Sequence, residues 1–263
     1  MVPFARLIRM SAAATVIALA GVWLTGCSEA SRMETRCMTG DVAVCIQLGD
    51  MYANGRGVPR DLGRAARAYD RACSGGAVDV CNTLGEIVEQ TGAIEGGLVK
   101  AEQLYVKACE GGSSRGCLNL GLVAAGREDF VRAFALYQKS CDGGWAGGCH
   151  HVAASYEQGE GVAKDVIKAL AVYTEACDGE YIESCTVAAG LYLAGEVVAK
   201  NVEAALRLYG KALQIYAESC KAGFDADCAE ADKLRTRVTL IAATQQQQVR
   251  PPTPTPVPDP IIK

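Results

Sequence analysis

The sequence predicts an all-α protein, a solenoid of helix-turn-helix repeats whose turns are stapled by disulfides. Cysteines stand in pairs, with seven residues between the two members, at six places along the chain. The pairs recur at intervals of 36, 36, 32, 36 and 43 residues, and a period in this range is typical of stacked helical repeats. The six pairs are Cys37–Cys45, Cys73–Cys81, Cys109–Cys117, Cys141–Cys149, Cys177–Cys185 and Cys220–Cys228.

The spacing within each pair indicates a turn rather than a helix. Two residues eight positions apart on one α-helix are separated by about 12 Å of rise, whereas a disulfide needs Cα atoms about 4.4–6.8 Å apart. Glycines such as Gly143 and Gly144 lie between the paired cysteines and suit a chain that reverses between two helices. Zinc sites usually have two to four residues between cysteines, and no Cys-x-x-Cys-His occurs. We therefore expect disulfides, with no metal and no cofactor.

Residues 1–26 are typical of a secretory signal peptide. Arg6 and Arg9 precede an apolar run that ends at Leu24-Thr25-Gly26-Cys27. These four residues resemble a bacterial lipobox, which implies diacylation of the Cys27 thiol and removal of residues 1–26. An ordinary cleaved signal or a membrane anchor is the alternative. The cysteine count favours the lipobox, because thirteen cysteines are six pairs and one left over, Cys27.

The export signal and the cysteines together indicate an oxidising compartment outside the cytosol. From Cys27 onward the chain has 24 basic and 30 acidic residues, a net charge of −6, so nucleic acid is not an expected partner. We expect a lipidated tether over 27–36 and membrane attachment through Cys27. By resemblance to enterobacterial sorting, Ser28 in place of Asp favours the outer membrane, with the protein facing the periplasm.

Each repeat contains two helical halves with apolar or small residues three, four and seven apart. The first half has Leu-Gly or a small pair after the second cysteine, as in Cys45-x-x-Leu48-Gly49-x-x-Tyr52, where the small residue lets a neighbouring helix approach closely. The second half carries one inward tyrosine, and we interpret this recurrent residue as a packing residue; it is Tyr69, Tyr105, Tyr137, Tyr173 and Tyr209 in successive repeats. In turns such as 54–61 and 158–165, glycine is expected to end one helix and Asp to cap the next.

Two irregular repeats and the C-terminal region complete the domain. The 32-residue repeat has a trimmed turn at 125–129, and the 43-residue repeat gains seven residues, nearly two helical turns, in its second helix. The charged run 229–240 is expected to form a helix that covers the last repeat. We place the repeat domain, with about five repeats and this capping helix, at 37–244. Residues 245–263 are rich in Gln and Pro and predict a disordered tail, with a ligand for another envelope protein as the alternative.

From Cys37 to about Leu240 the sequence resembles the Sel-one-like repeat, a relative of the tetratricopeptide repeat. The Leu-Gly-x-x-Tyr half, the Gly-x-Gly-Val turn, the Lys/Arg-Ala-x-x-x-Tyr half and the paired cysteines occur in the order of the disulfide-bearing Hcp proteins. The resemblance implies a right-handed solenoid. Departures are Val88 and Ala124 in place of the first-helix tyrosine, and the turns at 91–97 and 125–129. Hcp-type proteins are often labelled penicillin-binding or β-lactamases, so a weak β-lactam-binding or hydrolase activity is the alternative function.

Few residues suggest catalysis. The stretch Gly112-Ser113-Ser114-Arg115-Gly116 matches a nucleophile-elbow pattern but lies in a turn between helices, without the strand that the motif requires. The only histidines, His150 and His151, are adjacent and should point to different faces, and no Ser-x-x-Lys occurs. We name no catalytic residue and regard an enzyme as the less favoured class.

The favoured function is that of a cell-envelope scaffold. By comparison with the tetratricopeptide family, the first helices would line a concave surface on which amide and acidic groups bind a peptide backbone or a basic segment. The partner would be an envelope protein or peptide, or a cell-wall fragment. The expected lining residues are Gln47, Asp50, Asn82, Glu86, Asn119, His150, His151, Glu157 and Thr186.

Overall fold

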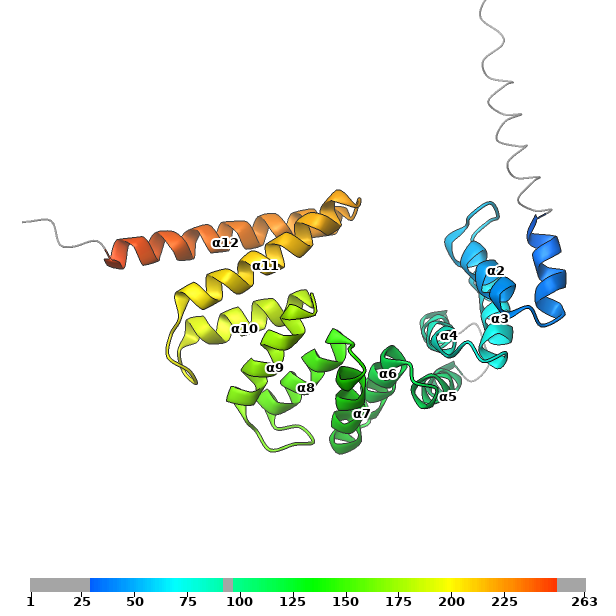
Figure 1. Cartoon of the computed structure of the whole chain (residues 1–263), viewed down its shortest axis with the longest axis horizontal. Helices are drawn as coiled ribbons and strands as arrows, with labels where there is room; N and C mark the ends of the chain where they lie inside the picture. The colour runs from blue at the N-terminus through cyan, green and yellow to red at the C-terminus, as the bar shows by residue number, and fades with distance from the viewer. Residues whose placement is uncertain (1–28, 92–96, 250–263) are drawn as a thin grey trace, which may run out of the picture. The chain divides into compact units, whose positions relative to one another are not determined.

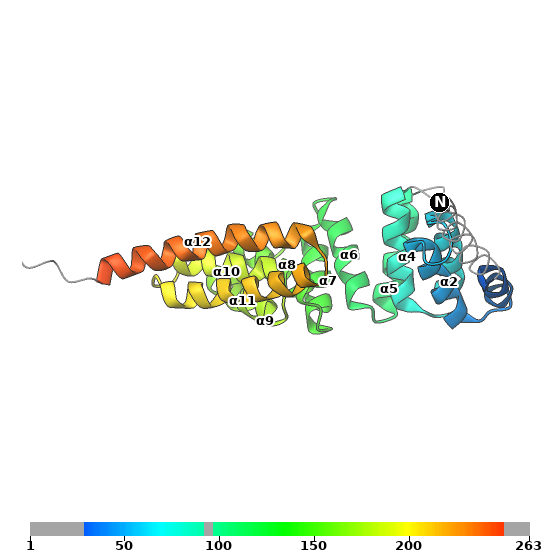
Figure 2. The ribbon, with the colours of Figure 1, turned by 90° about the horizontal axis from the view of Figure 1, so that it is seen from above.

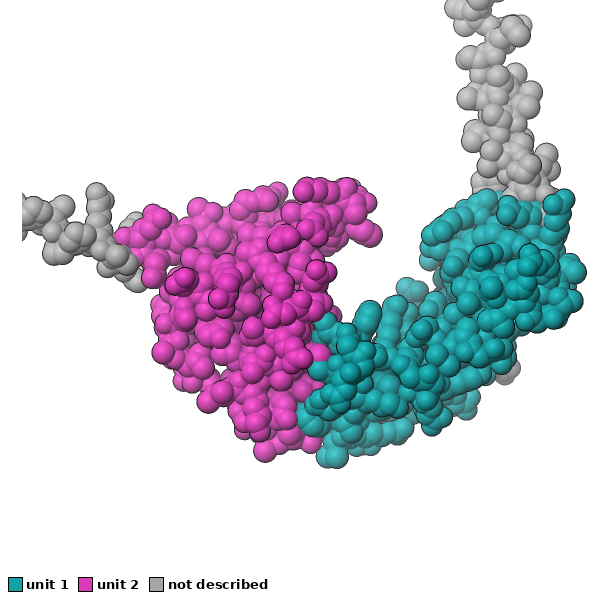
Figure 3. Space-filling view, viewed as in Figure 1, with its two compact units in different colours: residues 1–148 teal, residues 149–263 magenta. Residues whose placement is uncertain are grey.

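The computed structural model describes residues 29–91 and 97–249, and in these ranges every regular element is a helix. The chain divides into two compact units, residues 1–148 and 149–263, shown in separate colours in Figure 3. The expected all-α repeat fold is therefore confirmed. None of the described helices is both long enough and apolar enough to cross a bilayer.

Unit 1 is a series of helical hairpins. It begins with a helix at 29–38, and α2 packs on α3, α4 on α5 and α6 on α7, while α3 also contacts α4 and α5 contacts α6 (Figure 1). Each hairpin therefore buries its apolar stripe against its own partner and against the next hairpin. The helices are α2 (Val42–Asn54), α3 (Leu62–Ser74), α4 (Val78–Thr91), α5 (Gly97–Glu110), α6 (Ser114–Ala125) and α7 (Phe130–Asp142).

Unit 2 continues the pattern with longer helices at its end. The 20-residue α11 confirms that the extra residues of the last repeat lengthen its second helix. At the place expected for the capping helix, α12 packs along α11 and buries Ala231 and Leu234 (Figure 2). The helices are α8 (Ala146–Gln158), which begins in unit 1, α9 (Val166–Asp178), α10 (Ile182–Ala194), α11 (Val202–Lys221) and α12 (Asp225–Val249).

Disulfides close the short turns between helices. Five of the expected pairs are bonded with Cα atoms 4.5–4.9 Å apart, and Cys141 and Cys149 are also disulfide-bonded.

The longer turns follow the expected capping chemistry. Gly55 ends α2 with φ of 69°, and the carboxylates of Asp61 and Asp165 accept hydrogen bonds from backbone N–H groups in the first turns of α3 and α9.

The recurrent tyrosines pack against the small residues of the first helices, as expected. A Cβ atom added to Gly85 would lie 2.5 Å from the ring of Tyr105, and one added to Gly49 would lie 2.3 Å from the ring of Tyr69. These glycines are required because the ring occupies the space that a side chain would fill. The hydroxyls add hydrogen bonds that the sequence pattern did not predict: Tyr105 donates to Glu89 at 2.8 Å and Tyr69 to Asp50 at 2.7 Å.

The structure differs from the expected boundaries at both ends of the repeat domain. Residues 29–38, expected as tether, form a helix that packs on α2, because Ala30 is buried and the Tyr52 hydroxyl donates to Glu34 at 2.7 Å. At the other end α12 continues to Val249, because glutamine is a good helix former and extends the helix beyond the expected boundary at 244. The signal peptide, Cys27, the turn at 92–96 and the Pro-rich part of the tail lie outside the described residues.

Candidate binding groove in unit 1

A groove of about 460 Å³ lies between the beginnings of α4 and α6. Two disulfide-closed turns form its edges, one at Gly112 and Ser113 and the other from Gly143 to Trp145. The helices α4 and α6, each the first helix of its hairpin, contact each other directly, so successive first helices build one continuous surface. The remaining lining residues are Asp79, Asn82, Thr83, Ser114 and Arg115.

One of the expected binding residues, Asn82, lines this groove, and it shares a hydrogen-bond network with two others, Glu86 and Asn119. Asn82 is only 1% exposed, and its amide nitrogen donates to Glu86 at 3.0 Å. The amide nitrogen of Asn119 donates to the Asn82 oxygen at 2.9 Å and to Glu86 at 3.0 Å. A buried amide is costly unless its hydrogen bonds are made, and both polar atoms of the Asn82 side chain have partners. The network therefore joins α4 to α6 and fixes the floor of the groove.

Arg115 and Trp145 stand above this floor. One guanidinium nitrogen of Arg115 lies 2.9 Å from Oε1 of Glu86, and the guanidinium carbon lies 6.0 Å from the centroid of the Trp145 ring. Trp145 is 41% exposed, although an indole is among the side chains most often buried in interfaces. The arrangement offers a cation with free N–H groups and a flat apolar face beside amide and hydroxyl groups. Such a surface can hold a polar chain by hydrogen bonding and stacking.

The serine motif beside the groove has a structural role. The Ser113 hydroxyl accepts from the Gly116 N–H as the N-cap of α6, and the Ser114 hydroxyl donates to the Gly143 carbonyl at 3.0 Å. A nucleophilic serine would instead donate to a base. Within the described ranges, no group of three His, Cys, Asp or Glu side chains is placed to hold a metal ion.

Two further expected residues of unit 1 lie apart from the groove. Gln47 is exposed on α2. Asp50 is partly buried and accepts a hydrogen bond from the Tyr69 hydroxyl. This carboxylate therefore connects α2 to α3.

The expected residues of unit 2 are His150, His151, Glu157 and Thr186. His150 shares a hydrogen bond of 2.8 Å with the Ser184 hydroxyl, and its ring centroid lies 4.9 Å from that of Tyr181. Burial lowers the pKa of His150, and burial with the neighbouring His150 lowers the pKa of His151 to about 4, so both rings are neutral at pH 7. Glu157 accepts the Tyr173 hydroxyl at 2.8 Å, and the Thr186 hydroxyl bonds to the Glu183 carbonyl of its own helix.

Sequence reasoning missed Asp79, Thr83, Ser114, Arg115 and Trp145. It placed the lining after the second cysteine of each pair, whereas the groove also uses residues in the turn before it. A signal was present in Trp145, a large aromatic residue in a turn otherwise built of small residues.

The fold and the groove define a repeat protein of the helical-hairpin class, whose first helices present a surface for another molecule. The chain belongs to the Sel1 repeat family, because the Sel1 repeat model matches residues 42–76, 84–113, 114–145, 146–181 and 183–214. Proteins of this family are scaffolds suited to binding other proteins. No curated protein matches the chain as a whole.

The chain is also similar to solved structures. A Sel1 repeat protein from Oxalobacter formigenes is 23% identical, with a TM-score of 0.63 over 70% of this chain and 75% of that one, which shows the same fold. Cysteine rich protein B of Helicobacter pylori is 32% identical over 50% of this chain and 92% of that one, with a TM-score of 0.38.

Proposed function

We propose that this protein is a lipid-anchored scaffold of the bacterial cell envelope that binds an extended segment of a partner protein in the unit 1 groove. The observation that carries the proposal is the partly buried Asn82–Asn119–Glu86 network beside an exposed Arg115 and Trp145. Arginine and tryptophan are the residues most often responsible for binding energy at interfaces. A scaffold needs no catalytic group, and this groove offers hydrogen-bond donors, acceptors and one stacking face.

The chemistry of the groove favours a polar or basic segment. The carboxylate of Asp79 lines the groove, Glu86 is hydrogen-bonded to the lining residues Asn82 and Arg115, and the mature chain has an expected net charge of −6. Backbone amides of an extended peptide would donate to these oxygens, while a peptide carbonyl would accept from the free N–H groups of Arg115.

The proposed location rests on the disulfides and on the N-terminal sequence. Disulfides throughout the described repeats are typical of an exported, non-cytoplasmic protein. Acylation of Cys27 would attach the protein to the membrane through a residue only two positions before the first described helix. We favour the outer membrane, with the protein facing the periplasm.

Site-specific photo-crosslinking in the intact envelope tests the groove. A photoreactive residue replaces Thr83 or Asp79 at the groove, or Arg207 on α11 as the control, and crosslinked peptides are identified by mass spectrometry. We expect one partner segment to crosslink from both groove positions and not from Arg207. Equal capture from all three positions would contradict the proposal.

Affinity for the identified segment then tests the two exposed residues. Arg115→Ala with Trp145→Ala should weaken binding about 100-fold, since each truncation of such a residue costs on the order of 1–2 kcal/mol. The matched control is Arg207→Ala with Phe224→Ala, another exposed arginine and aromatic in unit 2. Unchanged affinity in the groove variant, or turnover of nitrocefin by the purified protein, would count against a scaffold that acts through this groove.

A further inference from the structure

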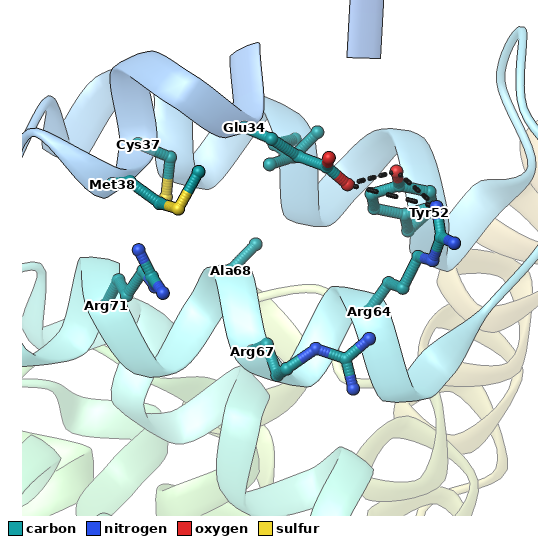
Figure 4. Close-up of a pocket in the computed structure, with 9 residues that line it drawn as sticks. Glu34, Cys37, Met38, Tyr52, Arg64, Arg67, Ala68 and Arg71 are labelled. Atoms are coloured by element: carbon teal, nitrogen blue, oxygen red, sulfur yellow. Dashed lines mark hydrogen bonds and ion pairs between the residues drawn. The ribbon is translucent and has the colours of Figure 1, made fainter. Parts of the chain in front are cut away.

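A second pocket in unit 1 is separate from the groove and lies in the first hairpin. It has a volume of about 160 Å³ and opens between the helix at 29–38, α2 and α3 (Figure 4). Its apolar lining comes from Cys37, Met38, Leu48 and Ala68, and its polar lining from Glu34, Tyr52, Arg64, Arg67 and Arg71. Three arginines and one carboxylate therefore line the pocket beside an apolar floor.

The single carboxylate of the pocket is already engaged. Glu34 accepts the Tyr52 hydroxyl at 2.7 Å, and Arg64 donates to the same hydroxyl at 3.1 Å and lies 3.9 Å from Glu34 (Figure 4). Arg64 also lies 3.6 Å from Asp61 at the start of its helix. These contacts satisfy Glu34 and Arg64 with each other and with Tyr52, and they hold the helix at 29–38 against α2 and α3.

Arg67 and Arg71 have no such partner. Neither guanidinium group forms an ion pair or a hydrogen bond with any residue of 29–91 or 97–249. They stand four positions apart on the same face of α3, and like charges at this spacing destabilise a helix. Two unpaired guanidinium groups on one helix face, next to a pocket, are the arrangement that an oxyanion would complete, because the planar fork of arginine matches a carboxylate.

The floor of the pocket indicates what carries the anion. Leu48 and Ala68 are each 4% exposed and Cys37 is 4% exposed, so the floor is apolar and well packed, while Met38 is 62% exposed at the rim. A volume of about 160 Å³ is about half of the smallest pockets that hold drug-sized ligands. The space suits one short aliphatic group and excludes a long acyl chain.

We propose that this pocket binds an aliphatic carboxylate, with the carboxylate on Arg67 and Arg71 and its short apolar stem over Leu48 and Ala68. The same chemistry is offered by the C-terminal residue of a peptide and by a free small acid. The site uses none of the groove residues, so either proposal can fail without the other.

The test measures binding of N-acetyl-leucine to the purified, oxidised protein by calorimetry or NMR. We expect N-acetyl-leucine to bind at least about tenfold more tightly than its uncharged amide or than acetate, because the amide lacks the anion and acetate lacks the stem. A short peptide ending in leucine, with a free or an amidated C-terminus, distinguishes the two sources. Tighter binding of the free-ended peptide identifies a protein C-terminus, and equal binding of peptide and N-acetyl-leucine identifies a free acid.

Three variants separate the parts of the site. Arg67→Gln with Arg71→Gln should reduce binding at least about tenfold, whereas the exposed control Arg207→Gln on α11 should leave it unchanged. Arg67→Lys with Arg71→Lys keeps the charge and loses the planar guanidinium fork. Its affinity should therefore lie between that of the unchanged protein and that of the double Gln variant. Ala68→Leu fills the floor and should weaken N-acetyl-leucine while leaving acetate unchanged, with circular dichroism to check the fold.

Several results would overturn the proposal. One is equal binding of N-acetyl-leucine by the protein and by the Arg67→Gln, Arg71→Gln variant. Another is no binding of N-acetyl-leucine while phosphatidylglycerol vesicles bind in a manner that depends on Arg67 and Arg71, which would assign the two arginines to the membrane surface.

Discussion

Tyr209 is fully buried in unit 2, and its hydroxyl has no hydrogen-bond partner among the described residues. The equivalent tyrosines of other repeats have one. Tyr69 donates to Asp50, five positions after Cys45, and Tyr105 donates to Glu89, eight positions after Cys81. On α10 the corresponding positions after Cys185 are Gly190 and Leu193, which carry no acceptor. A buried hydroxyl without a partner costs on the order of 1–3 kcal/mol.

Gly190→Asp should therefore stabilise the protein. A Cβ atom built on Gly190 meets no atom within 4 Å, so an aspartate can stand where Asp50 stands opposite Tyr69. We expect the free energy of unfolding to rise by about 1–2 kcal/mol, from the new hydrogen bond and from the removal of a helical glycine. Denaturant unfolding followed by circular dichroism measures the change.

Two controls isolate the hydrogen bond. Gly190→Ala supplies only the helix propensity, worth about 0.5–1 kcal/mol. In a Tyr209→Phe background, Gly190→Asp should gain no more than Gly190→Ala does. The same gain with and without the Tyr209 hydroxyl would show that the hydroxyl contributes nothing.

The tyrosines also show what a sequence pattern conveys about single residues. A period of three and four identifies the buried face of a helix, and Tyr105 and Tyr209 are buried as expected. The pattern does not report which side chain on the next helix reaches the hydroxyl, because that depends on the register of two packed helices. Asp50 and Glu157 were expected to face a ligand for this reason, and both accept a tyrosine hydroxyl.

Turns are the elements that repeat most regularly in this chain. The third residue after the first cysteine of a pair has a positive φ in each described turn, from 65° at Glu180 to 99° at Gly223. Glycine occupies this position in every pair except one, where Glu180 has φ of 65°. The left-handed conformation costs a non-glycine residue about 1–2 kcal/mol, because Cβ approaches a carbonyl oxygen.

Glu180→Gly should relieve this cost. The gain is reduced by the larger entropy of glycine in the unfolded chain, so we expect the free energy of unfolding to rise by about 0.5–1 kcal/mol. Glu180→Ala removes the exposed carboxylate and keeps Cβ, which makes it the matched control, and it should bring no gain. A midpoint of denaturant unfolding that does not rise for glycine, or rises equally for alanine, would contradict the conformational account.

Elements were predictable where the repeat pattern is strong. The six cysteine pairs and the capped turns follow local rules, so α2 to α11 lie where the pattern indicates them. The helix at 29–38 was missed because it carries Met33 where the other second helices have the recurrent tyrosine, so the repeat pattern does not indicate it. Its position depends on tertiary contacts, such as the hydrogen bond from Tyr52 to Glu34.

At the scale of the whole molecule, the same limit applies to the candidate site. Asn82, Glu86 and Asn119 could be predicted because each is a polar residue of a first helix soon after the second cysteine of a pair. To predict that these three residues form one network, or that Trp145 lies beside Arg115, one would need the distance between two hairpins. Sequence periodicity does not contain that distance, because it is set by the packing of small residues such as Gly116 of α6 against Ala108 of α5.

The disulfides are the covalent part of this packing. Each closes a loop of about nine residues, for which the chain-entropy model gives about 2.5 kcal/mol. The interior is rich in alanine, glycine and tyrosine, and many of its most buried residues are alanines such as Ala65 and Ala205, which bury little apolar area. We therefore infer that the stapled turns supply a large part of the net stability, which is about 5–15 kcal/mol for a typical domain.

Thermal unfolding of the oxidised and the fully reduced protein, followed by circular dichroism at 222 nm, tests this central claim most directly. The account predicts that reduction lowers the midpoint by at least about 10 °C, because the loss of several local disulfides exceeds about 5 kcal/mol and each 1 kcal/mol shifts Tm by about 2–4 °C in a chain of this size. An unchanged midpoint, with every cysteine titrating as a free thiol, would contradict it.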